Sequence, residues 1–291
     1  MEMNKMKWVA AAALAATMGV AQATPLAGQF FEGFQQLSDN SADKLVDVGP
    51  VDATHSVGKL DMGDRLIGIF TIETIEKSPF PTRFTSTTGR ELTGIFDITV
   101  VGKSGGPGAF SFAFAPTLGF DIDPTVAIKI FDASSFGGDV SLGAFTRVNN
   151  GLVDTVAEMM ANASDGLPFA KLGFGLTSFW FANTFTDDIS AVGGVPAPGN
   201  GGSFNLGLDF KANTSGVAFR TVPCLNPSTF TVVAVGTCGS GSLLGKGGAT
   251  TPFDSFDDIN FTVSVAEPSS IALVGLALVG LFGASRRRQL K

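Results

Sequence analysis

Histidine, tyrosine and cysteine are scarce or missing in this 291-residue chain, which has one histidine, His55, no tyrosine and two cysteines. A Ser-His-Asp or Cys-His mechanism would have to use His55 as its base, and no Gly-x-Ser-x-Gly motif presents a nucleophile. A conventional zinc site needs three or four His, Cys or carboxylate ligands, which this composition does not supply. We therefore expect a protein that is not an enzyme, with His55 in a polar loop or at a strand edge.

Exposed rings for stacking on sugars are also scarce, because Trp180 is the one tryptophan beyond residue 8 and tyrosine is absent. Phenylalanine, in contrast, occurs 27 times. Its side chain supplies apolar area without a polar group, so we expect most of these rings to lie in a core.

The N-terminus has the three parts of a secretory signal peptide. Lys5 and Lys7 form a basic segment, residues 8–20 form a short alanine-rich apolar stretch, and Ala21-Gln22-Ala23 follows. Signal peptidase recognises this small-x-small pattern. We expect residues 1–23 to be a signal peptide that is cleaved after Ala23.

The C-terminus carries a second hydrophobic segment. Residues 269–285 contain no charge, and Arg286, Arg287 and Arg288 follow directly. As a helix, these 17 residues would be about 26 Å long, near the lower limit for crossing a hydrocarbon layer of about 30 Å. We expect a transmembrane helix whose basic end stays in the cytoplasm, with the rest of the chain on the far side.

Ala266-Glu267-Pro268, the hydrophobic run and the arginine cluster together resemble the PEP-CTERM sorting tail of Gram-negative bacteria. Ala266 replaces the first proline of the usual motif, which leaves the processing point open. The resemblance covers residues 266–291 and implies recognition by an exosortase-type membrane protease. It also implies cleavage near the motif and release to the cell surface or the extracellular matrix. An ordinary single-span tail anchor is the alternative, with the same topology but permanent membrane retention.

Between the two signals, residues 24–265 form the expected exported domain, which is long enough for one large β domain. This part has 13 basic and 24 acidic residues, a net charge of −11. Such a surface repels nucleic acid and anionic lipid, so we expect neither as a partner. Cys224 and Cys238 both lie in this exported part and predict a disulfide; a redox pair is the weaker alternative.

Alternating apolar and polar residues predict a mainly β fold, a sandwich or jelly roll with at most one or two short helices. The strands are expected at residues 110–114, 126–131, 204–210, 217–222, 229–235 and 259–265, and one helix is expected within 152–163, ended by Gly166 and Pro168. Residues 63–72 and 89–98 resemble each other. We expect two equivalent strands, neighbours in one sheet, with Gly68 and Gly94 at bulges or close backbone approaches. Convergent strand composition is the alternative.

Carboxylate clusters are the remaining candidates for chemistry. They are Asp121 with Asp123, Asp187 with Asp188, and Asp254 with Asp257 and Asp258. Calcium binds such oxygen ligands, and paired acids hydrolyse glycosides when their separation is suitable. No EF-hand or calcium-binding repeat is present in the sequence, however, and aspartates at strand ends are usually turn residues. No cofactor is expected, with calcium the one possibility kept open.

These observations predict an exported cell-surface or matrix protein. Its route would cross the inner membrane of a Gram-negative bacterium, with signal peptidase and an exosortase-type protease as partners and extracellular polysaccharide as a further candidate. Many proteins with this tail are thought to be structural or adhesive in biofilm or floc, so the resemblance implies such a role. The alternative is a secreted carboxylate-dependent glycoside hydrolase or a calcium-dependent carbohydrate-binding domain.

Overall fold

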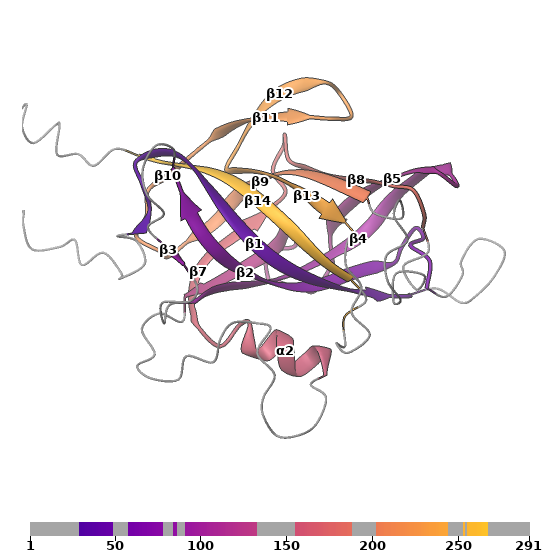
Figure 1. The fold of residues 1–291 in the computed structure, drawn as a ribbon, viewed down its shortest axis with the longest axis horizontal. Helices are drawn as coiled ribbons and strands as arrows, with labels where there is room; N and C mark the ends of the chain where they lie inside the picture. The colour runs from indigo at the N-terminus through magenta and orange to yellow at the C-terminus, as the bar shows by residue number, and fades with distance from the viewer. Residues whose placement is uncertain are drawn as a thin grey trace, which may run out of the picture.

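A computed structural model of the chain describes residues 29–48, 58–77, 84–85, 91–132, 155–187, 202–243, 253 and 255–266. The fold is mainly β, with one short helix among these residues (Figure 1). The elements are β1 (Gly33–Val46), β2 (Arg65–Glu76), β3 (Phe84–Thr85), β4 (Leu92–Gly106), β5 (Ala109–Pro116), β6 (Val126–Asp132), α2 (Val156–Asn162), β7 (Leu167–Gly173), β8 (Phe179–Thr184), β9 (Gly202–Asn213), β10 (Phe219–Arg220), β11 (Val222–Asn226), β12 (Thr231–Val235), β13 (Thr237–Leu243) and β14 (Ser255–Val265).

One 12-stranded antiparallel sheet contains every strand except β11 and β12. Its order is β3-β2-β1-β14-β13-β9-β7-β6-β4-β5-β8, and two further pairings, β2–β4 and β9–β8, close it on itself. Closure is possible because β4 and β9 are long, with 15 and 12 residues. Along one edge β4 pairs first with β6 and then with β5, and β9 in the same way pairs with β8 and then β7.

The expectation of two packed sheets is therefore wrong, although the expectation of a mainly β fold is confirmed. Period-2 alternation indicates which side chains face inward. It does not distinguish a closed sheet from a sandwich, because the strands of both have one apolar face. The strand expected at 217–222 is also wrong as a single element. Phe219 pairs with Val265, whereas Val222 pairs with Val235 in a separate two-stranded sheet.

Phenylalanine fills the interior, as the composition predicts. Trp180 lies at its centre, with ring centroids 5.9 Å from Phe96, 6.2 Å from Phe204 and 6.3 Å from Phe114. Phe70 and Phe112 are each 1% exposed. Aromatic rings without hydroxyl groups suit this space, because each buries much apolar area and leaves no polar group unsatisfied. Since Trp180 is 4% exposed, it contributes to the core and presents no sugar-stacking surface.

The two similar segments become β2 and β4, which are direct neighbours, so that expectation is confirmed. They pair antiparallel around Ile69 and Ile95, with Gly68 opposite Phe96 and Phe70 opposite Gly94. A Cβ atom at either glycine would overlap the phenylalanine ring opposite it. Each copy of Gly-Ile-Phe therefore provides the space that the ring of the other copy occupies.

Helix α2 covers the outside of the sheet over β1 and β2 (Figure 1). Thr155 and Glu158 form a capping box at its start, in which each side chain bonds the backbone N–H of the other residue. Met159 is buried against Ala42 and Ile69. The helix predicted within 152–163 is thus confirmed with shorter bounds.

Both ends of the described domain lie at one end of the sheet, because Gly33 at the start of β1 pairs with Val265 at the end of β14. The β4–β5 turn lies at the opposite end. Strand β4 begins beside Thr71 of β2, passes Arg65 at the start of β2 and continues to Gly106, away from the end where Gly33 lies. No helix among the described residues is long and apolar enough to cross a membrane. The terminal hydrophobic run at 269–285 lies outside them.

Gly94→Ala should lower the free energy of unfolding by about 1–3 kcal/mol, because the added methyl group would overlap the Phe70 ring and lie 2.7 Å from the Lys129 carbonyl oxygen. Gly106→Ala in the same strand is the control, since nothing lies within 4 Å of that Cβ position. Urea unfolding followed by circular dichroism measures both. Similar losses in the two variants would contradict a steric role for Gly94.

Candidate functional site

A groove of about 400 Å³ lies on the outer side of the sheet, beside the turn of the β11–β12 hairpin. Three neighbouring strands, β4, β5 and β8, form its floor. The lining residues are Gly102, Lys103, Ser104, Ser111, Phe112, Ala113, Phe181, Ala182, Asn183, Pro227 and Ser228. The groove is thus built from four segments that are distant in the chain.

Register places the polar groups of the groove side by side. Ser104 lies opposite Ser111 across β4 and β5, and Ser111 lies opposite Asn183 across β5 and β8. The Ser111 hydroxyl donates a hydrogen bond to the Asn183 side-chain oxygen. All three side chains are exposed or half-exposed. Phe181, which lies two residues before Asn183 and on the same face of β8, is half-buried and supplies an apolar wall.

The β11–β12 hairpin lies outside the closed sheet (Figure 1). Its base packs Val222, Cys224 and Val235 against Phe179 of β8. The predicted disulfide is confirmed: Cys224 of the hairpin is bonded to Cys238 of β13. A two-stranded ribbon is marginally stable by itself, so this covalent bond and the small apolar cluster hold it in place.

The tip of this hairpin exposes apolar side chains. Leu225 is 56% exposed, Val232 69% and Phe230 83%. Phe230 has φ of 54°, the left-handed region that a bulky L residue enters at a cost, and it is the one non-glycine residue with positive φ in the described part of the chain. Backbone strain of this kind costs about 1–3 kcal/mol and is concentrated at functional positions. The hairpin tip, residues 225–232, is therefore a second candidate site.

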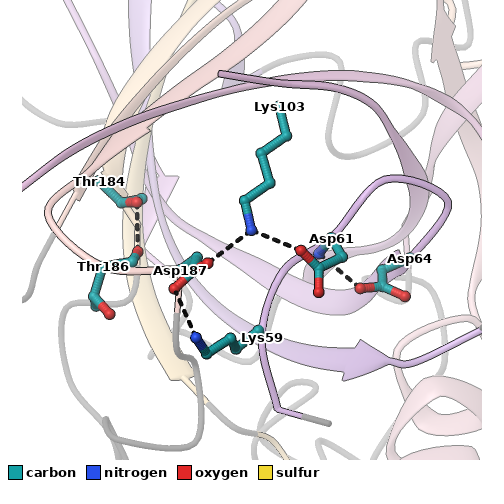
Figure 2. A network of polar contacts seen from close by, with 7 residues as sticks. All are labelled: Lys59, Asp61, Asp64, Lys103, Thr184, Thr186 and Asp187. Atoms are coloured by element: carbon teal, nitrogen blue, oxygen red, sulfur yellow. Dashed lines mark hydrogen bonds and ion pairs between the residues drawn. The ribbon is translucent and has the colours of Figure 1, made fainter. Parts of the chain in front are cut away.

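Lys103, one of the lining residues of the groove, belongs to a polar cluster with Asp61 and Asp187, which Figure 2 shows. Lys103 Nζ lies 2.7 Å from Asp61 Oδ1 and 2.7 Å from Asp187 Oδ2. Its ammonium also lies 5.2 Å from the ring centroid of Phe110. Burial acts to lower the pKa of Lys103, but the hydrogen bonds and charges of Asp187 and Asp61 raise it above its usual value. Lys103 therefore stays charged, and its charge is directed inward and compensated.

The same cluster is tied to the backbone. Asp64, which is fully buried, accepts a hydrogen bond from the backbone N–H of Asp61 at 2.7 Å and another from Val48 at 3.1 Å. The Leu60 N–H donates to the Asp187 carbonyl at 2.7 Å. These contacts hold separate segments together at this end of the sheet and attach them to β4, one of the three strands of the groove floor.

Three of the predicted carboxylates, Asp121, Asp123 and Asp187, make ion pairs or turn hydrogen bonds in the structure. Asp121 Oδ2 lies 2.7 Å from Lys171 Nζ and 3.2 Å from Lys129 Nζ. Asp123 accepts hydrogen bonds from the backbone and side chain of Thr125, as in a turn. Asp187 is bound to Lys103.

Other predicted residues are placed in part or lie outside the described residues. Asp257 and Asp258 lie in β14 opposite Ser41 and Asn40. Those outside are Asp188, Asp254, His55, Glu267, Pro268 and the arginines 286–288. Within the described residues, no three His, Cys, Asp or Glu side chains are grouped so that they could share a metal ion.

Sequence reasoning found the disulfide but missed the groove and the hairpin tip. The groove depends on which strands are neighbours, and alternation does not reveal this. A signal for the tip was present, because Asn226-Pro227-Ser228-Thr229 is rich in turn residues. The strand predicted from 229 begins only at Thr231, since Phe230 lies in the turn and its N–H bonds the Asn226 carbonyl at 2.9 Å.

Acid should destabilise the fold through Asp121. Burial acts to raise its pKa, but the hydrogen bonds from Lys171, the Asp123 backbone and Lys129 outweigh this and lower the pKa to about 2. A lowered carboxylate pKa stabilises the fold above pH 4, and this contribution is lost as the pH falls from about 4 to about 2. At pH 7 it is worth about 1–2 kcal/mol.

Denaturant unfolding of the wild type and Asp121→Asn at several pH values measures this contribution. The variant should be less stable at pH 7, and the difference should shrink towards pH 2. A difference that does not change with pH would show that the charge of Asp121 is unimportant.

No protein-family model matches the chain, and no curated protein matches it in sequence. A functional assignment therefore rests on the residues of this chain alone. Two surface features carry it, the groove on β4, β5 and β8 and the hairpin tip at residues 225–232.

Proposed function

We propose that the chain is an exported cell-surface or matrix protein with a structural or adhesive role. The signal peptide at 1–23 and the tail at 266–291 support export and sorting by an exosortase-type protease, on the residues quoted above. The tail would anchor the protein in the inner membrane through a helix at 269–285 until processing. Final delivery would be to the cell surface or to the extracellular matrix.

The position of the tail supports this route. Strand β14 ends at Val265, directly before the Ala266-Glu267-Pro268 motif. The Ala266 N–H donates to the Ala218 carbonyl at 2.7 Å, so the chain is held to the domain up to the first residue of the motif. A domain tethered at this end presents its opposite end, with the β4–β5 turn, away from the membrane.

The observation that carries the adhesive role is the apolar hairpin tip. Leu225, Phe230 and Val232 extend from a ribbon that a disulfide ties to the sheet. In water, such exposure and the strained backbone of Phe230 both disfavour the folded state. Their presence at a covalently supported tip is typical of a contact surface, because contact with an apolar partner would remove the exposed area from water.

The alternative, a carboxylate-dependent hydrolase or a calcium-dependent sugar-binding domain, has weaker support. None of the described residues that line the groove is acidic. Asp121 and Asp187 are both in ion pairs with lysines. A pair of acids facing one another across a cleft, which glycoside hydrolysis needs, is not seen among the described residues.

Phe230→Gly should weaken attachment of the protein to apolar surfaces without harming the fold. Glycine accepts positive φ, so stability should be equal or higher, by about 1 kcal/mol. Adsorption to hydrophobic beads and thermal unfolding measure the two effects. Ile122→Ser is the control, because it also removes a fully exposed apolar side chain, but from the β5–β6 loop and not from the hairpin. Unchanged adsorption of Phe230→Gly would reject the tip as an adhesive surface.

Sorting is tested in cells. An epitope tag placed in the domain should appear at the surface or in the medium of the wild type and remain in the membrane fraction of cells without the sorting protease. Arg286, Arg287 and Arg288 changed together to alanine should have the same effect, since the basic end holds the orientation. Normal surface delivery in both strains would overturn the sorting proposal.

A further inference from the structure

The groove on β4, β5 and β8 differs from the hairpin tip in chemistry. Its polar lining consists of hydroxyl and amide groups from Ser104, Ser111, Asn183 and Ser228. Lys103 is the one charged residue among its described lining, and its ammonium is bound by Asp61 and Asp187. The domain as a whole is strongly acidic. A concave surface whose one charged described residue is already paired by two aspartates is a local feature that does not follow from the acidic composition.

Apolar walls accompany these polar groups. Phe181 and Pro227 face the groove from β8 and from the hairpin turn. Ligand sites typically combine apolar lining with a few placed hydrogen-bonding groups. Hydroxyl and amide groups without net charge suit a ligand that is itself uncharged and rich in hydroxyl groups, with C–H faces that pack on the ring and the proline. A neutral sugar has this chemistry.

The polar surface continues beyond the groove. Phe181 lies opposite Asn205 of β9, and from there register aligns Ser240 of β13, Asn260 of β14 and Ser38 of β1 in one row across the strands. All four are exposed or half-exposed and uncharged. The Ser38 hydroxyl donates to the Asn260 side-chain oxygen at 2.9 Å.

The geometry of this row favours an extended ligand. Adjacent strands are about 4.8 Å apart, so the row offers hydrogen-bonding groups at regular intervals perpendicular to the strands. It starts at the wall of the groove, where a ligand would be held most closely. A chain of sugar units can follow such a row, whereas a single sugar would occupy the groove alone.

We infer that the groove and the row from Asn205 to Ser38 bind a neutral linear polysaccharide. This inference deepens the proposed function and rests on it, because the matrix is where such a chain would be met. Neither carboxylates nor calcium take part in recognition. The groove lies at the end of the sheet opposite the tail, so it stays accessible while the tail is attached.

Binding is tested with the full chain in detergent, by affinity electrophoresis and calorimetry against two neutral polysaccharides, a soluble β-glucan and a galactomannan, and against anionic alginate. The wild type should bind at least one neutral polymer and do so equally well in high salt and in a calcium chelator. Asn183→Ala and Ser111→Ala should each weaken binding about tenfold, as expected for the loss of one or two hydrogen bonds. Ser104→Trp should abolish it by filling the groove.

Two further variants separate the site from the fold and the groove from the row. Asn260→Ala should weaken binding of the polymer but leave binding of a disaccharide unchanged, because only a long ligand reaches β14. Ser164→Ala, beside α2, is the control and should change neither. All variants are checked by thermal unfolding, and Ser104 lies on the exposed face, so a bulky side chain there leaves the core intact.

The outcomes are distinct. Binding to neither neutral polymer, binding to alginate alone, or neutral binding that no groove variant weakens would overturn the inference. A protein that reaches the cell surface but binds no glycan would reject the glycan site and leave the proposed function standing. A protein that binds glycan but is never exported would reject the proposed function.

Discussion

Closure of the sheet through the pairing of β2 with β4 is the contact on which the rest of the structure depends. Without it, the strand order from β2 through β14 and β9 to β4 would leave two long edges, and unpaired edges invite association with other chains. The pairing is possible because Gly68 and Gly94 each leave room for the phenylalanine of the other strand. The backbones of β2 and β4 can then pair directly, with the Phe70 and Phe96 rings packed over the two glycines.

Closure has a consequence for the outer face. Most apolar side chains of the closed sheet turn inward, and outward positions of β9, β13, β14 and β1 hold uncharged polar residues such as Asn205, Ser240, Asn260 and Ser38. The hairpin lies outside the closed sheet and packs on it through the small cluster of Val222, Cys224 and Val235 with Phe179. This explains why Cys224 and Cys238 join the hairpin to β13: a covalent bond replaces the packing that an internal strand would have. Strain at Phe230 is tolerated for the same reason, since the closed sheet supplies the stability.

Strands β5, β6, β9, β12 and β14, the helix, the disulfide and the pairing of the two similar segments could be predicted from the sequence, because each depends on local pattern or simple pairing of like elements. Strands β1, β7, β8 and β13 were not predicted. Closure could not be predicted, since period-2 alternation fixes which face a residue occupies but not which strand lies beside it. The Lys103 cluster joins residues 61, 103 and 187, and the groove joins four segments. Such sites appear only when the strand order is known. The aspartates drew attention as functional candidates, yet Asp121 serves to hold two lysines.

The arrangement separates the expected attachment of the protein from its expected contacts. Gly33 and Val265 pair at one end of the sheet, so whatever precedes the domain and the tail that follows it leave from the same place. Ser104 and Ser111 lie near the opposite end, next to the β4–β5 turn. An anchor and a binding surface at the same end would compete for space against the membrane. Because the anchor and the binding surface lie at opposite ends, the domain can contact its surroundings both before and after the tail is cleaved. Cleavage would then change where the protein is held but not what it can bind.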